Sequence, residues 1–184
     1  IVDFDPQGAA SASLGINSNV LDTTIYDLLV ANRPDVRPAI HHTAVEGLDI
    51  VPANIDLSAA EVQLVNEVAR EQALHRVLRP IMDDYDVIFV DCQPSLGLLT
   101  INALTASHGV LIPLETEFFA LRGVALLVET VDRIRDRLNP RLQIDGILAT
   151  MVDPRTLHSR EVLERLEEAF QERLYNTQIR RTVK

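Results

Sequence analysis

Two apolar segments of this sequence end in aspartate. Residues 1–5 contain Asp3 and Asp5, and Asp91 directly follows the apolar run at residues 87–90. Four apolar residues followed by Asp form the Walker B pattern, in which the carboxylate reaches a magnesium ion, usually through water, while the strand fixes its position. If both segments are strands of one parallel sheet, they end at the same edge and three carboxylates converge there. Many strands also end in Asp simply to begin a turn, so the pattern alone leaves both interpretations open.

The elements that must position these carboxylates alternate between strand and helix, which predicts an α/β fold with a mostly parallel β-sheet and helices on both faces. Strands are expected at residues 1–5, 48–52, 87–91, 110–113, 143–151 and 175–179, and helices at 25–30, 58–78, 97–106, 121–138 and 159–170. The apolar run at 87–90 is typical of a strand buried on both faces. No linker or repeat interrupts the pattern, so one domain is expected over residues 1–184.

Two of the expected helices have the clearest signals. Ser58 and Glu61 match a capping box at the start of helix 58–78. One face of that helix would carry Val62, Val65, Ala69, Ala73 and Val77. The most regular 3.6-residue stripe belongs to helix 121–138 and consists of Leu121, Val124, Val128, Val131, Ile134 and Leu138.

Composition excludes several classes of protein. The 184 residues have a formal net charge of −10 and one cysteine, Cys92, which excludes an internal disulfide and any multi-cysteine metal site. The apolar runs fall far short of the ~20 residues that a membrane-spanning helix needs, and the chain starts without a secretory leader, so we expect a cytoplasmic protein. The acidic charge opposes general nucleic-acid binding, because it repels phosphates wherever no local basic patch offsets it.

Several segments resemble the ParA/Soj-type deviant-Walker ATPases, which partition bacterial chromosomes and plasmids. The matching segments, in the family's order, are residues 1–8 with Leu14-Gly15, 52–57, 91–104, 137–140 and 150–156. The resemblance covers essentially the full chain. It implies a P-loop NTPase fold, ATP and Mg²⁺ as cofactors, an ATP-bound homodimer and slow ATP hydrolysis.

The resemblance also implies roles for individual residues. Asp5 matches the residue that helps to place the attacking water, and Asp3 is its partner on the first switch segment. Asp91 matches the Walker B aspartate, which binds Mg²⁺ through water, and residues 93–97 match the second switch, which senses the γ-phosphate. Nucleotide contacts are implied for Gln93, Pro94 and Met151.

This chain departs from the family at three positions and in one segment. Gln93 replaces the usual Pro and Ala9 the usual Asn, both in switch regions that affect hydrolysis, and Arg180 replaces a Pro near the end. The family's glycine-rich phosphate loop needs two lysines, whereas the only lysine here is Lys184. We therefore expect a chain truncated before Ile1, and also before the family's last helix, or a degenerate relative; alone, it should be inactive and bind no ATP in the micromolar range.

A basic cluster lies where the family carries residues for non-specific DNA binding. It comprises Arg180, Arg181 and Lys184, with Arg155 and Arg160 as candidate neighbours. Terminal charge runs are often merely solvated, so both interpretations stay open. The resemblance implies nucleoid association and a ParB-like partner that stimulates hydrolysis, without membrane binding.

Two alternatives remain. A MinD-like division-site regulator uses the same ATPase on a membrane and would carry a C-terminal amphipathic helix. A non-catalytic interaction module would keep the fold and lose the nucleotide. Nucleotide binding by the full-length protein would separate this module from both ATPases.

Overall fold

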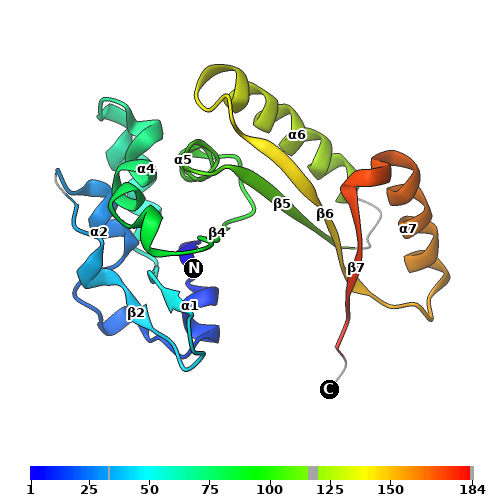
Figure 1. Ribbon diagram of the computed structural model, residues 1–184, viewed down its shortest axis with the longest axis horizontal. Coiled ribbons are helices and arrows are strands. Elements are labelled where there is room, and N and C mark those ends of the chain that lie inside the picture. The colour runs from blue at the N-terminus through cyan, green and yellow to red at the C-terminus, as the bar shows by residue number, and fades with distance from the viewer. Residues whose placement is uncertain (33, 116–119, 183–184) are drawn as a thin grey trace. The chain divides into compact units, whose positions relative to one another are not determined.

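The computed structural model describes residues 1–32, 34–115 and 120–182 (Figure 1). The chain divides into two compact units, Ile1–Ala106 and Ser107–Lys184, and each unit is described by itself. Both are built from parallel strands and helices, as the alternating sequence pattern predicts. Within the described residues, no helix combines the length and the apolar character needed to cross a bilayer. The expectation of one domain over residues 1–184 stays a prediction.

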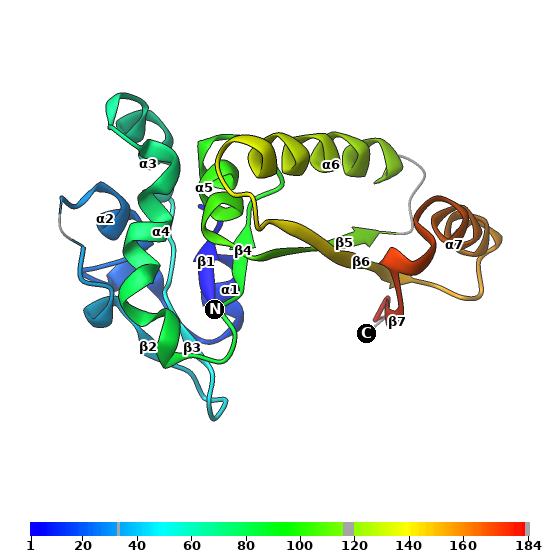
Figure 2. The same cartoon turned by 45° about the horizontal axis from the view of Figure 1, so that its top comes forward.

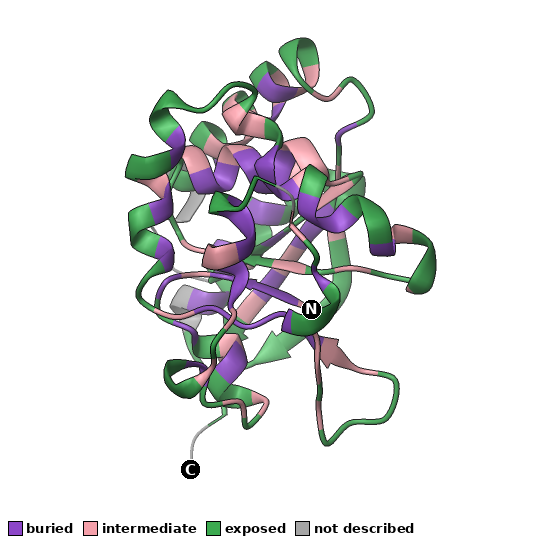
Figure 3. Cartoon of the chain, turned by 90° about the vertical axis from the view of Figure 1, so that its left-hand side faces the viewer, coloured by how far each residue is buried: buried purple, intermediate pink, exposed green. Residues whose placement is uncertain are grey.

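The first unit is built around strand β1, Val2–Phe4, which is buried along its whole length (Figure 3). On one side β1 pairs in parallel with β4, Val90–Cys92 (Figure 2). On the other side the amide of Asp3 donates to the carbonyl oxygen of Val51 at 3.0 Å, in a parallel bridge. This central strand places its last residues between the ends of two neighbouring segments.

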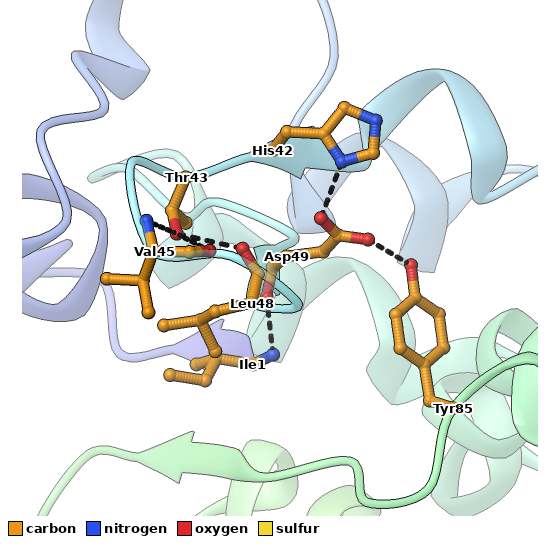
Figure 4. Close-up of polar contacts among 7 residues, drawn as sticks. All are labelled: Ile1, His42, Thr43, Val45, Leu48, Asp49 and Tyr85. Carbon is orange, nitrogen blue, oxygen red and sulfur yellow. Dashed lines mark hydrogen bonds and ion pairs between the residues drawn. The ribbon is translucent and has the colours of Figure 1, made fainter.

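A short antiparallel hairpin precedes that bridge. Its strands are β2, His41–His42, and β3, Asp49–Ile50. The Asp49 carboxylate lies between His42 Nδ1, at 2.6 Å, and the Tyr85 hydroxyl, which donates at 2.8 Å (Figure 4). The hydrogen bonds from His42 and then Tyr85 lower the pKa of Asp49, and burial followed by the bond to Asp49 raises the pKa of Tyr85 to about 12. This polar cluster fastens the hairpin to the segment before β4.

In the described part of the first unit, five α-helices and five 3₁₀ turns accompany these strands. The α-helices are α1 (Ala9–Ser13), α2 (Ile25–Val30), α3 (Leu57–Gln63), α4 (Ala73–Leu78) and α5 (Leu98–Ala106). The 3₁₀ turns are η1 (Ser18–Val20), η2 (Arg37–Ala39), η3 (Leu64–Asn66), η4 (Arg70–Gln72) and η5 (Arg79–Asp84). Apolar residues of α2, α3, α4 and α5 form one core with β1. The helices expected at residues 25–30 and 97–106 correspond to α2 and α5.

The expected helix over residues 58–78 is wrong as a single element. It breaks between η3 and η4, where Ala69 adopts a left-handed conformation with φ 54°. Val62 and Val65 are 74% and 50% exposed, so they do not share a buried face with the residues of α4. The expected capping box is also wrong, because α3 starts one residue before Ser58.

The expectation that residues 87–90 form a strand buried on both faces is wrong as well, although Ile88 and Val90 pack partly buried against the core. Strand β4 begins only at Val90, and Val87 and Phe89 are 61% and 59% exposed. The described part of the first unit pairs β4 with β1 alone. A strand with one paired edge is not enclosed as an interior strand would be.

The second unit holds a three-stranded parallel sheet in the order β5-β6-β7. Its elements are β5 (Gly109–Glu115), α6 (Ala120–Arg137), β6 (Gln143–Val152), α7 (Leu157–Phe170), η6 (Gln171–Arg173) and β7 (Leu174–Arg180). Of the expected stripe on α6, Val124, Val131 and Ile134 are buried and Leu138 is 36% exposed, while the side chain of Leu121 lies outside the described residues. Residues of α6 and α7 share one apolar cluster with β5 and β6.

Candidate functional site

The ends of β1 and β4 bring two of the predicted carboxylates together. Asp3 and Asp91 are direct partners in the parallel register, and Asp5 follows two residues after Asp3. Burial, then the charges of Asp3 and Asp5, raise the pKa of Asp91, which shows that the three groups share an electrostatic environment. The prediction that both strands end at one edge is therefore confirmed.

Asp3 is buried completely, at 0% exposure. Its Oδ2 atom accepts hydrogen bonds from the Ser11 amide at 2.8 Å and the Ser11 hydroxyl at 2.6 Å, and its Oδ1 atom accepts from the Asp5 amide at 3.3 Å. Asp3 is therefore not exposed to solvent at the strand end. All three of these hydrogen bonds join Asp3 to protein groups, so its carboxylate stabilises the Asp5 and Ser11 backbone.

Asp5 begins a tight turn that carries Pro6 at its second position. Its carbonyl oxygen accepts from the Gly8 amide at 2.9 Å, and its Oδ1 atom accepts from the Gln7 amide at 2.9 Å. Asp at the first position and Pro at the second are favoured residues for such a turn. Its Oδ2 atom makes no hydrogen bond within the described part of the chain, and the side chain is half-buried, so this oxygen is free to bind water.

The predicted second switch is the loop between β4 and α5. Gln93 is half-buried and Pro94 is exposed. The Ser95 carbonyl accepts from the Thr100 hydroxyl at 2.6 Å, and Glu61 Oε1 accepts from the Leu99 amide at 3.4 Å. Glu61 of α3 therefore accepts from an amide in the first turn of α5.

Met151 belongs to the second unit, where it lies near the end of β6. Its backbone is left-handed, with φ 55°, and the register between β6 and β7 shifts at this point. Its side chain is 45% exposed. A non-glycine residue held in this conformation stores strain, and such strain is concentrated at functional sites. The nucleotide contact predicted for Met151 stays a prediction.

Four of the five predicted DNA-binding residues lie at the carboxyl end of the second unit's sheet. Arg155 makes a double contact with Asp153, at 2.9 Å from each carboxylate oxygen, which lowers the pKa of Asp153 to about 2. Arg160 Nε donates to Pro154 O at 3.0 Å, and the amide of Arg181 donates to Val152 O at 3.1 Å. The fourth, Arg180, is exposed at the end of β7. Lys184 lies outside the described residues.

The oxygen atoms of the β1–β4 edge fit magnesium better than they fit phosphate. Asp91 is exposed and makes no hydrogen bond or ion pair within the described residues, so its oxygens are available, and Mg²⁺ prefers oxygen ligands while keeping several waters. In the described part of the chain, no three His, Cys, Asp or Glu side chains converge enough to hold a metal directly. The phosphates of ATP would need cationic groups, and across residues 1–32, 34–115 and 120–182 no ion pair involves Asp3, Asp5 or Asp91.

The sequence analysis did not single out Ser11, which holds Asp3 at this edge, and it assigned Glu61 to its own helix and not to α5. Ser11 lies in a run of small residues, Ala9 to Ser13, and nothing local distinguishes it from Ser13. Only the fold shows that Ser11 is buried whereas Ser13 is exposed.

Comparisons with known proteins agree with this geometry. Residues 1–144 match a family model described as an AAA domain. Over its whole length the chain is 56% identical to an uncharacterised protein of Mycobacterium tuberculosis, of which it spans 58%. It is 45% identical to the sporulation initiation inhibitor protein Soj of Bacillus subtilis and 44% identical to the chromosome partitioning protein ParA of Myxococcus xanthus, again over its whole length, and spans 72% and 65% of those proteins.

Solved structures show the same similarity. The cobyrinic acid a,c-diamide synthase of Mycobacterium smegmatis, with bound ATP analogue and magnesium, superimposes with a TM-score of 0.91 at 40% identity, covering 98% of this chain and 73% of that one. A plasmid partition protein from Borrelia burgdorferi, at 24% identity and a TM-score of 0.81, covers 98% of this chain and 76% of its own and supports the fold alone.

Proposed function

The chain belongs to the Soj/ParA family of partitioning ATPases, and from this premise we propose that its parent protein hydrolyses ATP to partition a bacterial chromosome or plasmid. The observation that carries the proposal is the pairing of Asp3 with Asp91, which sets Asp5 and Asp91 at one edge. The chain spans between 58% and 72% of the relatives named above, so the activity is proposed for the full-length protein.

In this proposal each carboxylate has a separate task. Asp91 would hold Mg²⁺ through water, and the metal, when bound, would neutralise charge on the phosphates. Asp5 orients the attacking water with its free Oδ2 atom. The loop at residues 93–97 senses the γ-phosphate, and a nucleotide contact is also proposed for Met151. Positioning and charge stabilisation carry most of the catalysis in this class of reaction.

We extend the proposal to partners through the basic residues of the second unit. ATP-bound dimers bind DNA without sequence preference through Arg180, Arg181 and Lys184, assisted by Arg160 and Arg155. A ParB-like centromere-binding protein stimulates hydrolysis, and the protein associates with the nucleoid. Support comes from the gathering of four arginines at one end of the sheet of an otherwise acidic chain.

Phosphate release by the full-length protein tests the proposal. Turnover of Mg-ATP should be slow alone and should rise when duplex DNA and the ParB-like partner are both added. Replacing Arg180 and Arg181 with Glu should weaken binding to every duplex alike, and the salt slope of binding should fall by about 0.9 for each DNA phosphate that the protein no longer neutralises. A full-length protein that binds no ATP would contradict the proposal and favour a non-catalytic module.

A further inference from the structure

One buried serine fastens three segments around the turn that carries Asp5. Ser11 is 0% exposed, and both its amide and its hydroxyl donate to Asp3 Oδ2. The same hydroxyl oxygen accepts from the Ala53 amide at 3.2 Å. A single side chain therefore connects the end of β1, helix α1 and the loop after β3.

Helix α1 depends on this contact because it cannot cap itself. It has only five residues, its N-cap residue is Gly8, and no side chain at the N-cap makes a hydrogen bond. The first amides of a helix lack partners within the helix, and an N-cap side chain normally accepts from the third one. Ser11 is that third residue. Asp3, eight residues upstream, supplies the missing oxygen.

The Asp3 carboxylate accepts hydrogen bonds from residues on both sides of the turn at residues 5–8. Asp3 accepts from the Asp5 amide where the turn begins and from Ser11 just after it ends. Gly8 has φ +63°, and a Cβ there would lie 2.8 Å from Ala53 O, so the backbone already touches the neighbouring loop. The position of Asp5 therefore depends on the hydrogen bonds that join Ser11 of α1 to Asp3 and Ala53.

We propose that Ser11 is a positioning residue for hydrolysis: its hydroxyl holds the Asp5 turn in the place from which Asp5 can orient water, and it does not itself touch the nucleotide. Asp3 then works as the anchor of that turn and not as a catalytic group. The inference rests on the proposed function, because it needs a reaction in which the position of Asp5 matters.

The test compares four variants of the full-length protein in Mg-ATP turnover. Ser11→Ala should lower kcat by about 10- to 100-fold, since small misplacements of a catalytic group have effects of this size, and leave KM within about twofold. Ser11→Thr keeps the hydroxyl and should restore kcat, while Ser11→Cys, a weak donor of similar size, should fall between them. Ser13→Ala, on the exposed face of α1, is the matched control and should behave as wild type.

Amide hydrogen exchange of Gln7, Gly8 and Ala53 is the second measurement. The exchange rate should increase from Ser11→Thr to Ser11→Cys to Ser11→Ala, the order in which kcat falls. Exchange can also be measured on a variant that is too unstable for kinetics. Three results would overturn the inference. The first is an unchanged kcat in Ser11→Ala together with faster amide exchange, and the second is an equal fall of kcat in Ser11→Ala and Ser11→Thr. The third is a KM that rises as much as kcat falls. A wild-type protein without ATP turnover would instead reject the proposed function.

Discussion

The ends of β1 and β4 share a sequence pattern and a register position, yet their aspartates have opposite surroundings. Asp3 is fully buried and accepts three hydrogen bonds. Asp91, its partner in the pairing, is exposed, accepts none within the described residues and has a raised pKa. A buried, satisfied polar group supports the fold, whereas a group whose surroundings disfavour its charge is a candidate for function. The contrast separates Asp3, an anchor of the fold, from Asp91, a candidate for ligand binding.

The largest effect is expected at Asp5, which follows the anchor and is proposed to orient water. Asp5→Ala in the full-length protein should keep ATP binding and dimerisation while turnover falls by about 10²–10⁴-fold, as for the loss of an acid–base or water-orienting group. Phosphate release and sedimentation with ATP measure the two properties. Unchanged turnover would remove Asp5 from the site.

A large loss of stability is expected at Asp3. Asp3→Ala leaves the Ser11 amide and hydroxyl and the Asp5 amide without their acceptor, and each buried unsatisfied donor costs about 1–3 kcal/mol. The free energy of unfolding should fall by about 3 kcal/mol or more, as measured by urea denaturation. A loss below about 1 kcal/mol would show that the anchor is not needed.

Replacing Asp91 should stabilise the protein, whereas replacing Asp3 should destabilise it. The pKa of Asp91 is raised in the folded protein, so its negative charge lowers the free energy of unfolding at neutral pH. This cost disappears as the pH falls and the carboxylate becomes protonated. Asp91→Asn should therefore raise the melting temperature of the nucleotide-free protein, by about 1–2 °C at neutral pH. The gain should shrink as the pH is lowered. A melting temperature that falls at neutral pH would show that Asp91, like Asp3, stabilises the fold.

The smallest effect extends the comparison to Asp153, which follows β6. Its carboxylate is occupied by Arg155, an arginine of the proposed DNA-binding cluster. Asp153→Asn should release Arg155 for phosphate and steepen the salt slope of DNA binding by about 0.9, the value for one further neutralised phosphate. Fluorescence anisotropy on two unrelated duplexes measures it, with Asp145→Asn on the same strand as control. A slope that stays the same would show that Arg155 does not reach DNA.

Much of this fold could be predicted because its signals are local. Helix α2 begins after Thr24, whose amide donates to Asp27 three residues later at 2.8 Å, and the expected range matched. The shared edge of β1 and β4 followed from strand–helix alternation, which requires parallel neighbours. These features depend on residues close in sequence or on topology.

The break in the expected helix at residues 58–78 could not be predicted, because its compensation comes from elsewhere. Asn102 of α5, at 0% exposure, accepts from the Leu74 amide at 3.1 Å and donates to Arg70 O at 2.9 Å. These contacts satisfy backbone groups next to the break. Residues 58–78 contain no glycine, and their apolar residues keep a helical spacing across the break. The role of Ser11 was hidden for the same reason: its partners lie 8 and 42 residues away.

Calorimetric titration of the full-length protein with ATP tests the central claim most directly, namely that the β1–β4 edge holds a magnesium nucleotide through Asp91. Wild type should bind ATP in the micromolar range with Mg²⁺, and Asp91→Asn should weaken this binding by about 10- to 100-fold, as for loss of an outer-shell group. Without Mg²⁺ the Asp91→Asn protein should bind ATP at least as tightly as wild type, because it carries one negative charge fewer beside the phosphates. Equal affinity of both proteins in the presence of Mg²⁺ would contradict the account.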